Sequence, residues 1–417
     1  MIFYTLYAND RGELLDDPYL QMLGGSGDKW VAPDPEEMTP LPEGASLVTV
    51  PRQRAVGLDG YGSPKLVSGD EAAWAVAALL PQGFTRTLIP AGVRAENGNG
   101  KLPLLGYAAI GFYDGQIYAA ALQTDEHRKW HPDNFNTDDL PLKIKKFRTK
   151  YPRNRIYAQL EQCAAEYSCF TAQNIFYRRW EGGIPTENAC NACCLGCISE
   201  DHMGILSPQV RLSFHPELEE ICAVGVEHLA KAEDAIISFG QGCEGDPALN
   251  AELLAAAIRK IRAAAGTGTI NMNTNAGYAE GVKKMCAAGL DSMRVSIFSC
   301  LSHNYNKYHN PRGYDLQTVT DSLKLAKEHG CFIALNLLTF PGFTDMESEI
   351  EALLAFVSKN PVDMIQFRNL NIDPLQLWQQ IDISEEGTGI VNLIRVLETE
   401  APHLRLGSYT PPVGKKI

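Results

Sequence analysis

The second half of the chain alternates strand-like with helix-like segments, and this alternation restricts the fold more than any other feature of the sequence. Six runs rich in apolar and β-branched residues are expected as strands: residues 174–177, 235–239, 269–274, 292–298, 332–340 and 364–370. Each of the last five is preceded by a helix-length segment: residues 216–231, 247–264, 277–288, 316–328 and 346–358. Strands and helices that alternate in this way form βαβ units around a parallel sheet. The sequence therefore predicts an α/β fold with a partial (βα)6 TIM-like barrel, rather than the closed barrel of eight units.

The first 150 residues lack this alternation, and we expect them to form a mostly β accessory domain that recognises the substrate. The clearest local pattern is a hairpin of residues 107–113 and 116–122, joined by Asp114-Gly115. This dipeptide suits the positive φ angles of a type I′ turn. The expected parts of the chain are an N-terminal domain of residues 1–150, a linker helix over 151–172, the barrel over 173–372 and a C-terminal extension over 373–417.

Composition and charge exclude several classes of protein. The chain is 45% apolar and 21% charged, which is typical of globular proteins and unlike disordered or fibrous ones. Its 37 basic and 50 acidic residues give a net charge of −13, which argues against a broad nucleic-acid-binding face. No apolar run approaches the ~20 residues that a helix needs to cross a bilayer. The first residues lack the basic segment of a signal peptide, so we expect a cytoplasmic location and no membrane partner.

The predicted strands carry polar residues where a fully covered parallel strand is normally apolar. These residues are Asn271, Asn273, Asn275, Arg294, Ser296, Asn336, Gln366 and Arg368. Their spacing of two places the polar residues of each strand on one face. Because buried polar groups need partners, we expect a polar barrel interior that holds a ligand. The alternative is a hydrogen-bond network that satisfies itself.

Four of the eleven cysteines lie within eight residues, at Cys190, Cys193, Cys194 and Cys197. Disulfides are rare in cytoplasmic proteins, so this clustering indicates a metal centre. The Cys190-x3-Cys194-x2-Cys197 spacing offers three corners of a [4Fe–4S] cube and leaves the fourth iron open to another ligand. An open metal position is typical of a catalytic site. Zinc bound by all four thiols is the alternative, although adjacent Cys193 and Cys194 do not easily both point inward.

The cysteine spacing and its place after the first predicted strand resemble the radical S-adenosylmethionine (radical SAM) superfamily, over about residues 173–372. The resemblance implies that Cys190, Cys194 and Cys197 hold the [4Fe–4S] cluster and that S-adenosylmethionine chelates its open iron. The reduced cluster of such enzymes cleaves S-adenosylmethionine to a 5′-deoxyadenosyl radical, which takes hydrogen from a substrate. A reducing partner such as flavodoxin or ferredoxin is implied too. One departure is Gly196, where the family usually has an aromatic residue beside the adenine.

The loop after the second strand resembles the Gly-Gly-Glu-Pro loop of the family, here Gly240-Gln241-Gly242-Cys243-Glu244. Glycines let the backbone approach a ligand closely, and a carboxylate can hold its ammonium group. We expect Glu244 to fill this role in preference to Asp246.

Further expected contacts to S-adenosylmethionine come from the next two strands. By resemblance, Ser296 suits a ribose hydroxyl and Arg294 suits the methionine carboxylate, which a planar guanidinium binds well. Asn273 is a further candidate for contact with the ligand. Arg368 and Asn371, at the end of the sixth strand, are the best candidates for contact with the substrate.

The substrate and the reaction after hydrogen abstraction are not specified by the sequence. A peptide or a small metabolite fits the acidic chain better than RNA does, although an RNA-modifying enzyme remains an alternative. A non-catalytic iron–sulfur or zinc protein is the alternative from another class. Cys243 and Cys300 lie just beyond strand ends, and we expect them to be packing residues, as most free cysteines are.

Overall fold

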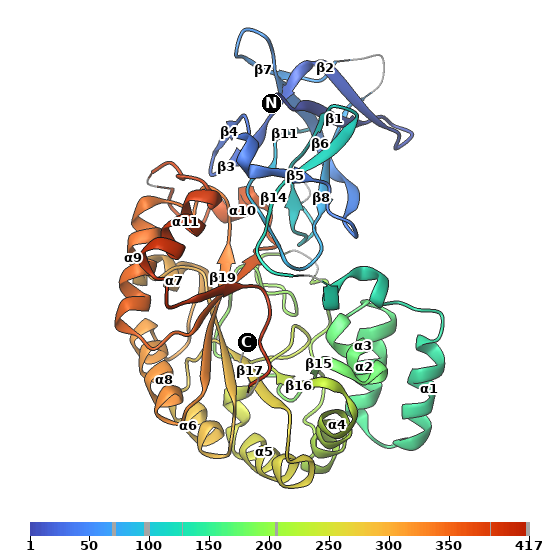
Figure 1. The fold of residues 1–417 in the computed structure, drawn as a ribbon, viewed down its shortest axis with the longest axis vertical. Coiled ribbons are helices and arrows are strands. Elements are labelled where there is room, and N and C mark those ends of the chain that lie inside the picture. Colours follow the sequence, from blue (N-terminus) through green and yellow to red (C-terminus); the bar gives the residue numbers. More distant parts are fainter. Residues whose placement is uncertain (69–71, 96–100, 127, 205–206, 384, 414–417) are drawn as a thin grey trace.

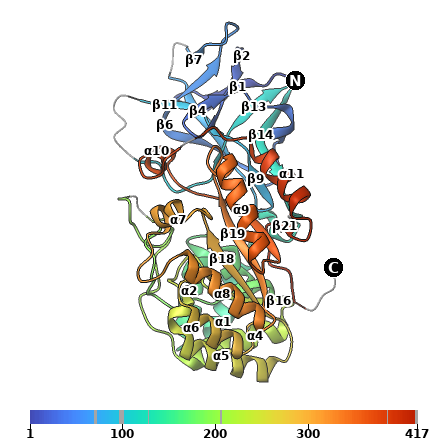
Figure 2. The ribbon, with the colours of Figure 1, turned by 90° about the vertical axis from the view of Figure 1, so that its left-hand side faces the viewer.

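The computed structural model describes residues 1–417 except residues 69–71, 96–100, 127, 205–206, 384 and 414–417. An N-terminal unit of short strands sits above a curled parallel sheet whose outer side is covered by helices (Figure 1). Seen from the side, this β unit caps one end of the curled sheet (Figure 2). No helix in the described part of the chain is long and apolar enough to cross a membrane.

The N-terminal unit is mostly β, as the sequence predicts. Its strands are β1 (Tyr4–Ala8), β2 (Leu14–Met22), β3 (Gly24–Ser26), β4 (Lys29–Val31), β5 (Met38–Pro40), β6 (Ser46–Leu58), β7 (Pro64–Leu66), β8 (Trp74–Leu79), β9 (Phe84–Arg86), β10 (Ile89–Pro90), β11 (Gly92–Arg94), β12 (Tyr107–Ala108), β13 (Ile110–Tyr113) and β14 (Gln116–Gln123). The predicted hairpin is present, with β13 and β14 antiparallel and Tyr113 opposite Gln116. Its turn residues Asp114 and Gly115 have φ angles of 47° and 77°, in the left-handed region that a type I′ turn requires.

Three helices connect this unit to the parallel sheet: α1 (Leu140–Lys150), α2 (Arg155–Ala165) and α3 (Phe170–Tyr177). Asn154 caps α2, because its side chain accepts a hydrogen bond from the backbone N–H of Tyr157. The strand expected at residues 174–177 is wrong, since these residues end helix α3. A short apolar run does not by itself distinguish a strand from a buried helix, and here Gln173 donates to the Ala164 carbonyl and fixes α3 against α2.

The parallel sheet has the order β15 to β21 without interruption, and every neighbouring pair is parallel. Its strands are β15 (Arg179–Gly183), β16 (Glu233–Phe239), β17 (Thr269–Thr274), β18 (Ser292–Ile297), β19 (Phe332–Thr339), β20 (Met364–Asn369) and β21 (Arg405–Gly407). The accompanying helices are α4 (Leu218–Lys231), α5 (Ala251–Ala265), α6 (Ala279–Ala287), α7 (Ser302–His309), α8 (Leu316–Glu328), α9 (Glu347–Lys359), α10 (Pro374–Trp378) and α11 (Ile390–Glu400). The mixed α/β fold with a partial barrel is confirmed. Strands β16 to β20 were predicted, whereas β15 and β21 were not.

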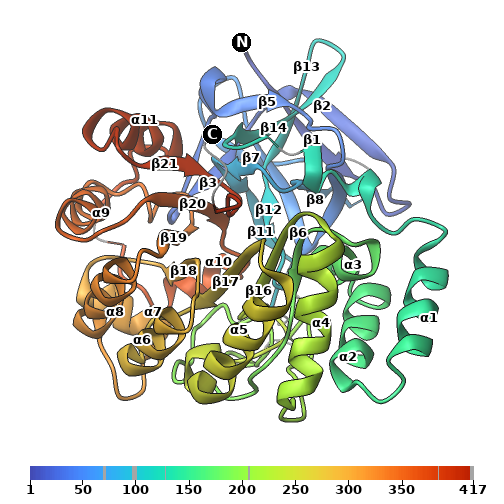
Figure 3. The same cartoon turned by 60° about the horizontal axis from the view of Figure 1, so that its bottom comes forward.

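The main apolar core lies between this sheet and its outer helices (Figure 3). Ile237, Met272 and Val295 are buried on three successive strands, and they pack with Leu254 and Ile258 of α5 in one cluster. Complete burial of each such side chain contributes about 1.5–3 kcal/mol. Since the apolar residues of the strands face the helices, the alternate polar residues face the inside of the curled sheet.

The β unit and the tail both reach the carboxyl ends of the strands. The backbone N–H of Arg86 in β9 donates to Asn369 Oδ1 (2.9 Å), and the buried Arg86 guanidinium donates to the carbonyl of Leu370. After β21 the chain passes Asp125, whose carboxylate accepts from the N–H of Ser408 (2.9 Å). The space inside the sheet is thereby bordered by the sheet itself, by the β unit and by the C-terminal tail.

Candidate functional site

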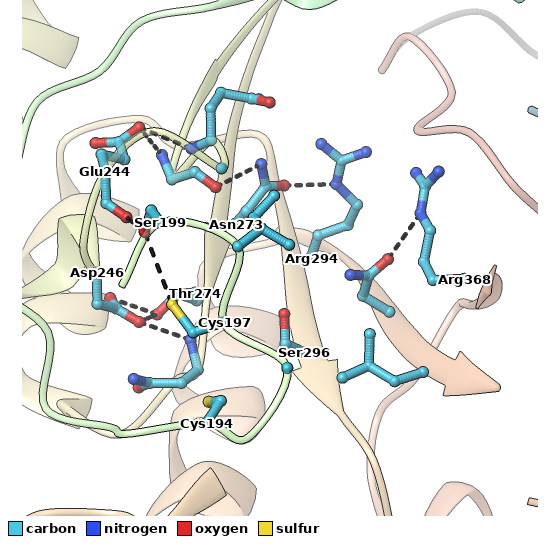
Figure 4. A pocket seen from close by; sticks show the side chains of 18 of the residues that line it. Cys194, Cys197, Ser199, Glu244, Asp246, Asn273, Thr274, Arg294, Ser296 and Arg368 are labelled. Carbon is cyan, nitrogen blue, oxygen red and sulfur yellow. Dashed lines mark hydrogen bonds between the residues drawn. The ribbon is translucent and has the colours of Figure 1, made fainter. Parts of the chain in front are cut away.

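A cavity of about 470 Å³ lies inside the curled sheet at the carboxyl ends of its strands. Every residue that the sequence predicts for the cluster or for S-adenosylmethionine lines this cavity: Cys190, Cys194, Cys197, Gly240, Gln241, Gly242, Glu244, Asn273, Arg294 and Ser296. Arg368 and Asn371, the predicted substrate contacts, line it as well. Figure 4 shows Cys194 and Cys197 on one side of the space and Arg294 and Arg368 on the other.

The cysteine loop is held in place by the end of helix α7. The backbone N–H of Cys193 donates to the carbonyl of His309 (3.0 Å), and that of Leu195 donates to the carbonyl of Tyr308 (3.0 Å). These bonds place the thiols of Cys190, Cys194 and Cys197 at the cavity. Cys193 is buried and does not line the cavity.

Gly196 leaves room for an aromatic ring from another element. A Cβ at this position would come within 2.7 Å of the Tyr308 hydroxyl, which is part of the cavity wall. The Tyr308 hydroxyl of α7 thus lies where a side chain at position 196 would project.

Each of the three cavity cysteines has a nitrogen near its sulfur. His309 Nδ1 lies 3.4 Å from Cys194 Sγ, Arg211 Nη2 lies 3.7 Å from Cys197 Sγ, and the side-chain nitrogen of Asn275 lies 3.9 Å from Cys190 Sγ. The N–H of Phe298 donates to Nε2 of His309 (3.2 Å). Because Nε2 is the acceptor, the hydrogen of the neutral ring is on Nδ1 and points to Cys194.

The chemistry of the donor set fits an iron–sulfur cluster. Burial raises the pKa of Cys190 to about 11 and that of Cys194 well above its ordinary value. These thiols are therefore protonated at neutral pH unless a metal cation replaces the proton. Thiolates with N–H donors at the sulfurs are the environment in which iron–sulfur clusters are held and tuned.

Glu244 connects the glycine loop to the segment before the cysteines. Its Oε1 accepts from the N–H groups of Gly240 (2.6 Å) and Gln241 (2.7 Å). Its Oε2 accepts from the N–H groups of Thr186 (2.7 Å) and Glu187 (3.2 Å), and from the Thr186 hydroxyl (3.0 Å). Burial raises the pKa of Glu244 to about 7, against the effect of these donors. Both oxygens are thus occupied by the protein, and an ammonium group would have to share them.

The carboxylate of Asp246, two residues further along, is also bound by the protein itself. Its carboxylate accepts from the N–H groups of Ala248 (3.0 Å) and Asn275 (2.7 Å) and from the hydroxyl of Thr274. Burial raises the pKa of this carboxyl above its ordinary value. The groups of this loop that remain for a ligand are therefore backbone groups and the amide of Gln241.

Asn273 joins the glycine loop to the fourth strand of the sheet. Its Nδ2 donates to the carbonyl of Gly240 (3.1 Å), and its Oδ1 accepts from Nε of Arg294. Gly240 has a φ of 80°, and a Cβ there would lie 1.9 Å from the Asn273 carbonyl oxygen, so only glycine fits. Arg294 also forms an ion pair with Glu181 of β15 (2.6 Å). The interior network is thus partly satisfied by the protein, as the alternative interpretation of the strand pattern expected.

Cys243 and Cys300 do not line the cavity. Cys243 is buried against the thiol of Cys163, and burial raises the pKa of Cys300 above its ordinary range.

Several residues of the cavity wall were missed by sequence reasoning. Glu181 lies on β15, which was not predicted. Arg211, Trp130 and Tyr409 lie in segments whose sequences show neither helical nor strand periodicity. His309 belongs to a polar segment whose individual residues give no signal for a role at the cluster.

Comparison with known proteins identifies a domain within the chain. Residues 184–357 match the family model described as the Radical SAM superfamily. A search of the curated proteins gave no match.

Similar solved structures have low sequence identity. A methylornithine synthase (PylB) is 15% identical with a TM-score of 0.36, covering 57% of this chain and 68% of that chain. HydG, a maturase of the [FeFe]-hydrogenase, is 15% identical with a TM-score of 0.40, covering 65% and 66%. SuiB of Streptococcus suis, bound to S-adenosylmethionine, is 13% identical with a TM-score of 0.34, covering 57% of each. The chain thus spans about half to two thirds of the length of such proteins, and similarity at this level identifies neither substrate nor reaction.

The family implies a [4Fe–4S] cluster and S-adenosylmethionine as cofactors, and enzymes of this family need a reductant and a substrate. The matched residues contain the cysteine loop, the glycine loop and strands β16 to β19. Residues 184–357 are a radical SAM domain, so the chain carries the domain of a radical SAM enzyme whose subfamily is unidentified.

Proposed function

We propose that this enzyme cleaves S-adenosylmethionine at a [4Fe–4S] cluster held by Cys190, Cys194 and Cys197, and abstracts hydrogen from a peptide or small-metabolite substrate. The observation that carries the proposal is that these thiols and the predicted S-adenosylmethionine contacts line one cavity. When reduced, the bound cluster supplies the electron that cleaves the sulfonium and generates the 5′-deoxyadenosyl radical.

The protein's own groups would position the cofactor across the cavity. Glu244 holds the glycine loop close to the cysteine loop, so that Gly242 and the Gln241 side chain face the ligand. Arg294, aligned by Glu181 and Asn273, offers its remaining guanidinium N–H groups to a carboxylate. Ser296 lies two residues further along the same face of β18, with its hydroxyl available for a ribose.

The walls contributed by the β unit and the tail would exclude water from the radical. Gln82 comes from the β unit, Trp130 from the segment before α1, and Tyr409 from the tail. Partly apolar walls suit radical chemistry, since exclusion of water keeps reactive groups from side reactions. A cavity of about 470 Å³ is in the range of small-molecule sites, which supports a small molecule or a short peptide segment as the substrate.

The direct test is formation of 5′-deoxyadenosine. The protein is purified and reconstituted with iron and sulfide without oxygen, then mixed with S-adenosylmethionine and dithionite, and products are measured by liquid chromatography and mass spectrometry. We expect 5′-deoxyadenosine and methionine from the wild type and from Cys193→Ala, and none from Cys194→Ala. Absence of 5′-deoxyadenosine from fully cluster-loaded wild type would overturn the proposal.

A further inference from the structure

One side of the cavity carries a guanidinium group that forms no ion pair with any carboxylate of the described residues. Arg368 lies on β20, well apart from Cys194 and Cys197 in the close view (Figure 4). Its Nε donates to Asn336 Oδ1 (3.0 Å) and its Nη2 to Gln366 Oε1 (3.3 Å), both neutral amides. Among the residues that the structure describes, no carboxylate lies within 4.0 Å of this guanidinium, although Arg294 has one in Glu181.

The environment of Arg368 makes an unpaired charge costly. Burial lowers the pKa of Arg368 to about 10, and the nearby positive charge of Arg294 acts in the same direction, while the carboxylates of Glu181 and Asp125 oppose this from beyond ion-pair distance. A cation removed from water needs a counter-charge or a full set of hydrogen bonds. The two amide acceptors leave part of the guanidinium without partners, and these remaining N–H groups belong to a residue of the cavity wall.

Two further donors of the same cavity also lack acceptors. The hydroxyl of Tyr409 and Nε2 of Gln241 are buried and have no hydrogen-bond partner within the described residues. Tyr409 is within electrostatic range of Arg368, and its ring stacks on Trp130 with centroids 5.6 Å apart and planes 17° apart. Since buried donors normally have acceptors, these groups indicate a ligand rich in oxygen.

We propose that Arg368 and Tyr409 bind a carboxylate of the substrate, with Trp130 as the adjoining apolar wall. The substrate class is therefore a carboxylic acid: an amino acid, a peptide that presents a carboxylate, or an acidic metabolite. This inference rests on the proposed function and specifies its substrate. A planar guanidinium with free N–H groups is the side chain best suited to such a group.

The cofactor also has a carboxylate, so the two sources must be distinguished. Arg294 is linked to the glycine loop through Asn273, whereas Arg368 adjoins Asn369, which donates to the β unit at the Phe84 carbonyl (2.9 Å). Arg294 is thus placed for the cofactor and Arg368 for a second molecule.

The first arm of the test measures the cofactor. Cluster-loaded wild type and Arg368→Gln are titrated with S-adenosylmethionine by anaerobic calorimetry, and we expect affinities within about twofold. Loss of a charged hydrogen bond usually weakens affinity ten- to hundredfold. The proposal would be overturned if Arg368→Gln bound S-adenosylmethionine that much more weakly than wild type, while decarboxylated S-adenosylmethionine bound both proteins equally. Arg368 would then hold the carboxylate of the cofactor.

The second arm uses benzoate and its neutral isostere benzamide as probes of the cluster-loaded protein saturated with S-adenosylmethionine. We expect wild type to prefer benzoate by at least about tenfold, and Arg368→Gln to lose this preference. Arg368→Lys, which keeps the charge without the planar fork, should keep part of it and controls for folding. Arg259→Gln, at an exposed position of α5, should behave as wild type.

Equal binding of the two probes to wild type, or binding of neither, would overturn the carboxylate site. The same preparations are assayed for 5′-deoxyadenosine, which reports the proposed function separately. Continued cleavage without any carboxylate preference would refute the substrate class alone.

Discussion

Replacement of Glu244 by Gln tests whether this carboxylate holds the two loops of the site together. Oε1 accepts two backbone N–H groups, and Oε2 accepts two more together with a hydroxyl. A glutamine keeps one oxygen and turns an NH2 group toward the other donors. In the best arrangement two buried N–H groups lose their acceptor.

The expected cost follows from that count. A buried donor left without a partner costs about 1–3 kcal/mol, so Glu244→Gln should lower the free energy of unfolding by about 2–6 kcal/mol. This is a large part of the ~5–15 kcal/mol that stabilises a typical domain. The glycine loop should also loosen, and binding of S-adenosylmethionine should weaken.

Anaerobic urea denaturation of the cluster-loaded protein, followed by circular dichroism, measures the change. The matched control is Glu351→Gln, an exposed glutamate on α9, which should alter stability by less than about 0.5 kcal/mol. A Glu244→Gln protein as stable as this control would refute the structural role of the carboxylate.

Three further predictions concern the cluster and a buried histidine. Replacing all three cluster cysteines by Ala should remove about four irons per chain, whereas Cys193→Ala should retain most of them, as measured by iron analysis. His309→Leu removes the N–H donor at Cys194 and should lower the reduction potential of the cluster, as measured by an EPR-monitored titration. His309→Gln, which can donate an N–H, should restore part of the potential. Equal potentials in wild type and His309→Leu would contradict the assigned tautomer. Burial lowers the pKa of His228 to about 4, below its unfolded value near 6.5. The folded state therefore binds fewer protons than the unfolded state between these two pH values. As the pH falls from 7 to 4, this residue lowers the free energy of unfolding of the wild type by about 3 kcal/mol. His228→Gln should lack this part of the acid destabilisation, and an unchanged pH profile in denaturation would contradict the burial of a neutral ring.

The strands of the barrel were predictable where their sequences are apolar and flanked by turn residues. Strand β17 was predicted with its observed bounds, and β18 to β20 each end within one residue of the expected position. Strand β15 was missed because Arg179-Trp180-Glu181-Gly182-Gly183 has no β-branched residue. Its glycines serve close packing instead, since a Cβ at Gly182 would lie 2.3 Å from Ile175 Cδ1 of α3.

The cluster cysteines of the site, which were predictable, lie close together in the sequence, whereas His309 and Tyr409, which were missed, lie far from them. The cysteines lie close together in the sequence, so their spacing alone indicates a metal centre. His309 and Tyr409 reach the site from more than a hundred residues away, through the packing of α7 and the return of the tail. The role of Glu244 was also not predictable, because a loop carboxylate that binds a ligand and one that binds backbone N–H groups look alike in sequence.

The most direct test of the account is Mössbauer spectroscopy of the protein reconstituted with iron-57, with and without S-adenosylmethionine. If Cys190, Cys194 and Cys197 leave one iron of the cluster open to the cofactor, its addition should give that iron a spectrum distinct from the other three. An unchanged spectrum at saturating S-adenosylmethionine, or a cluster whose irons are all bound by cysteine, would contradict the central claim.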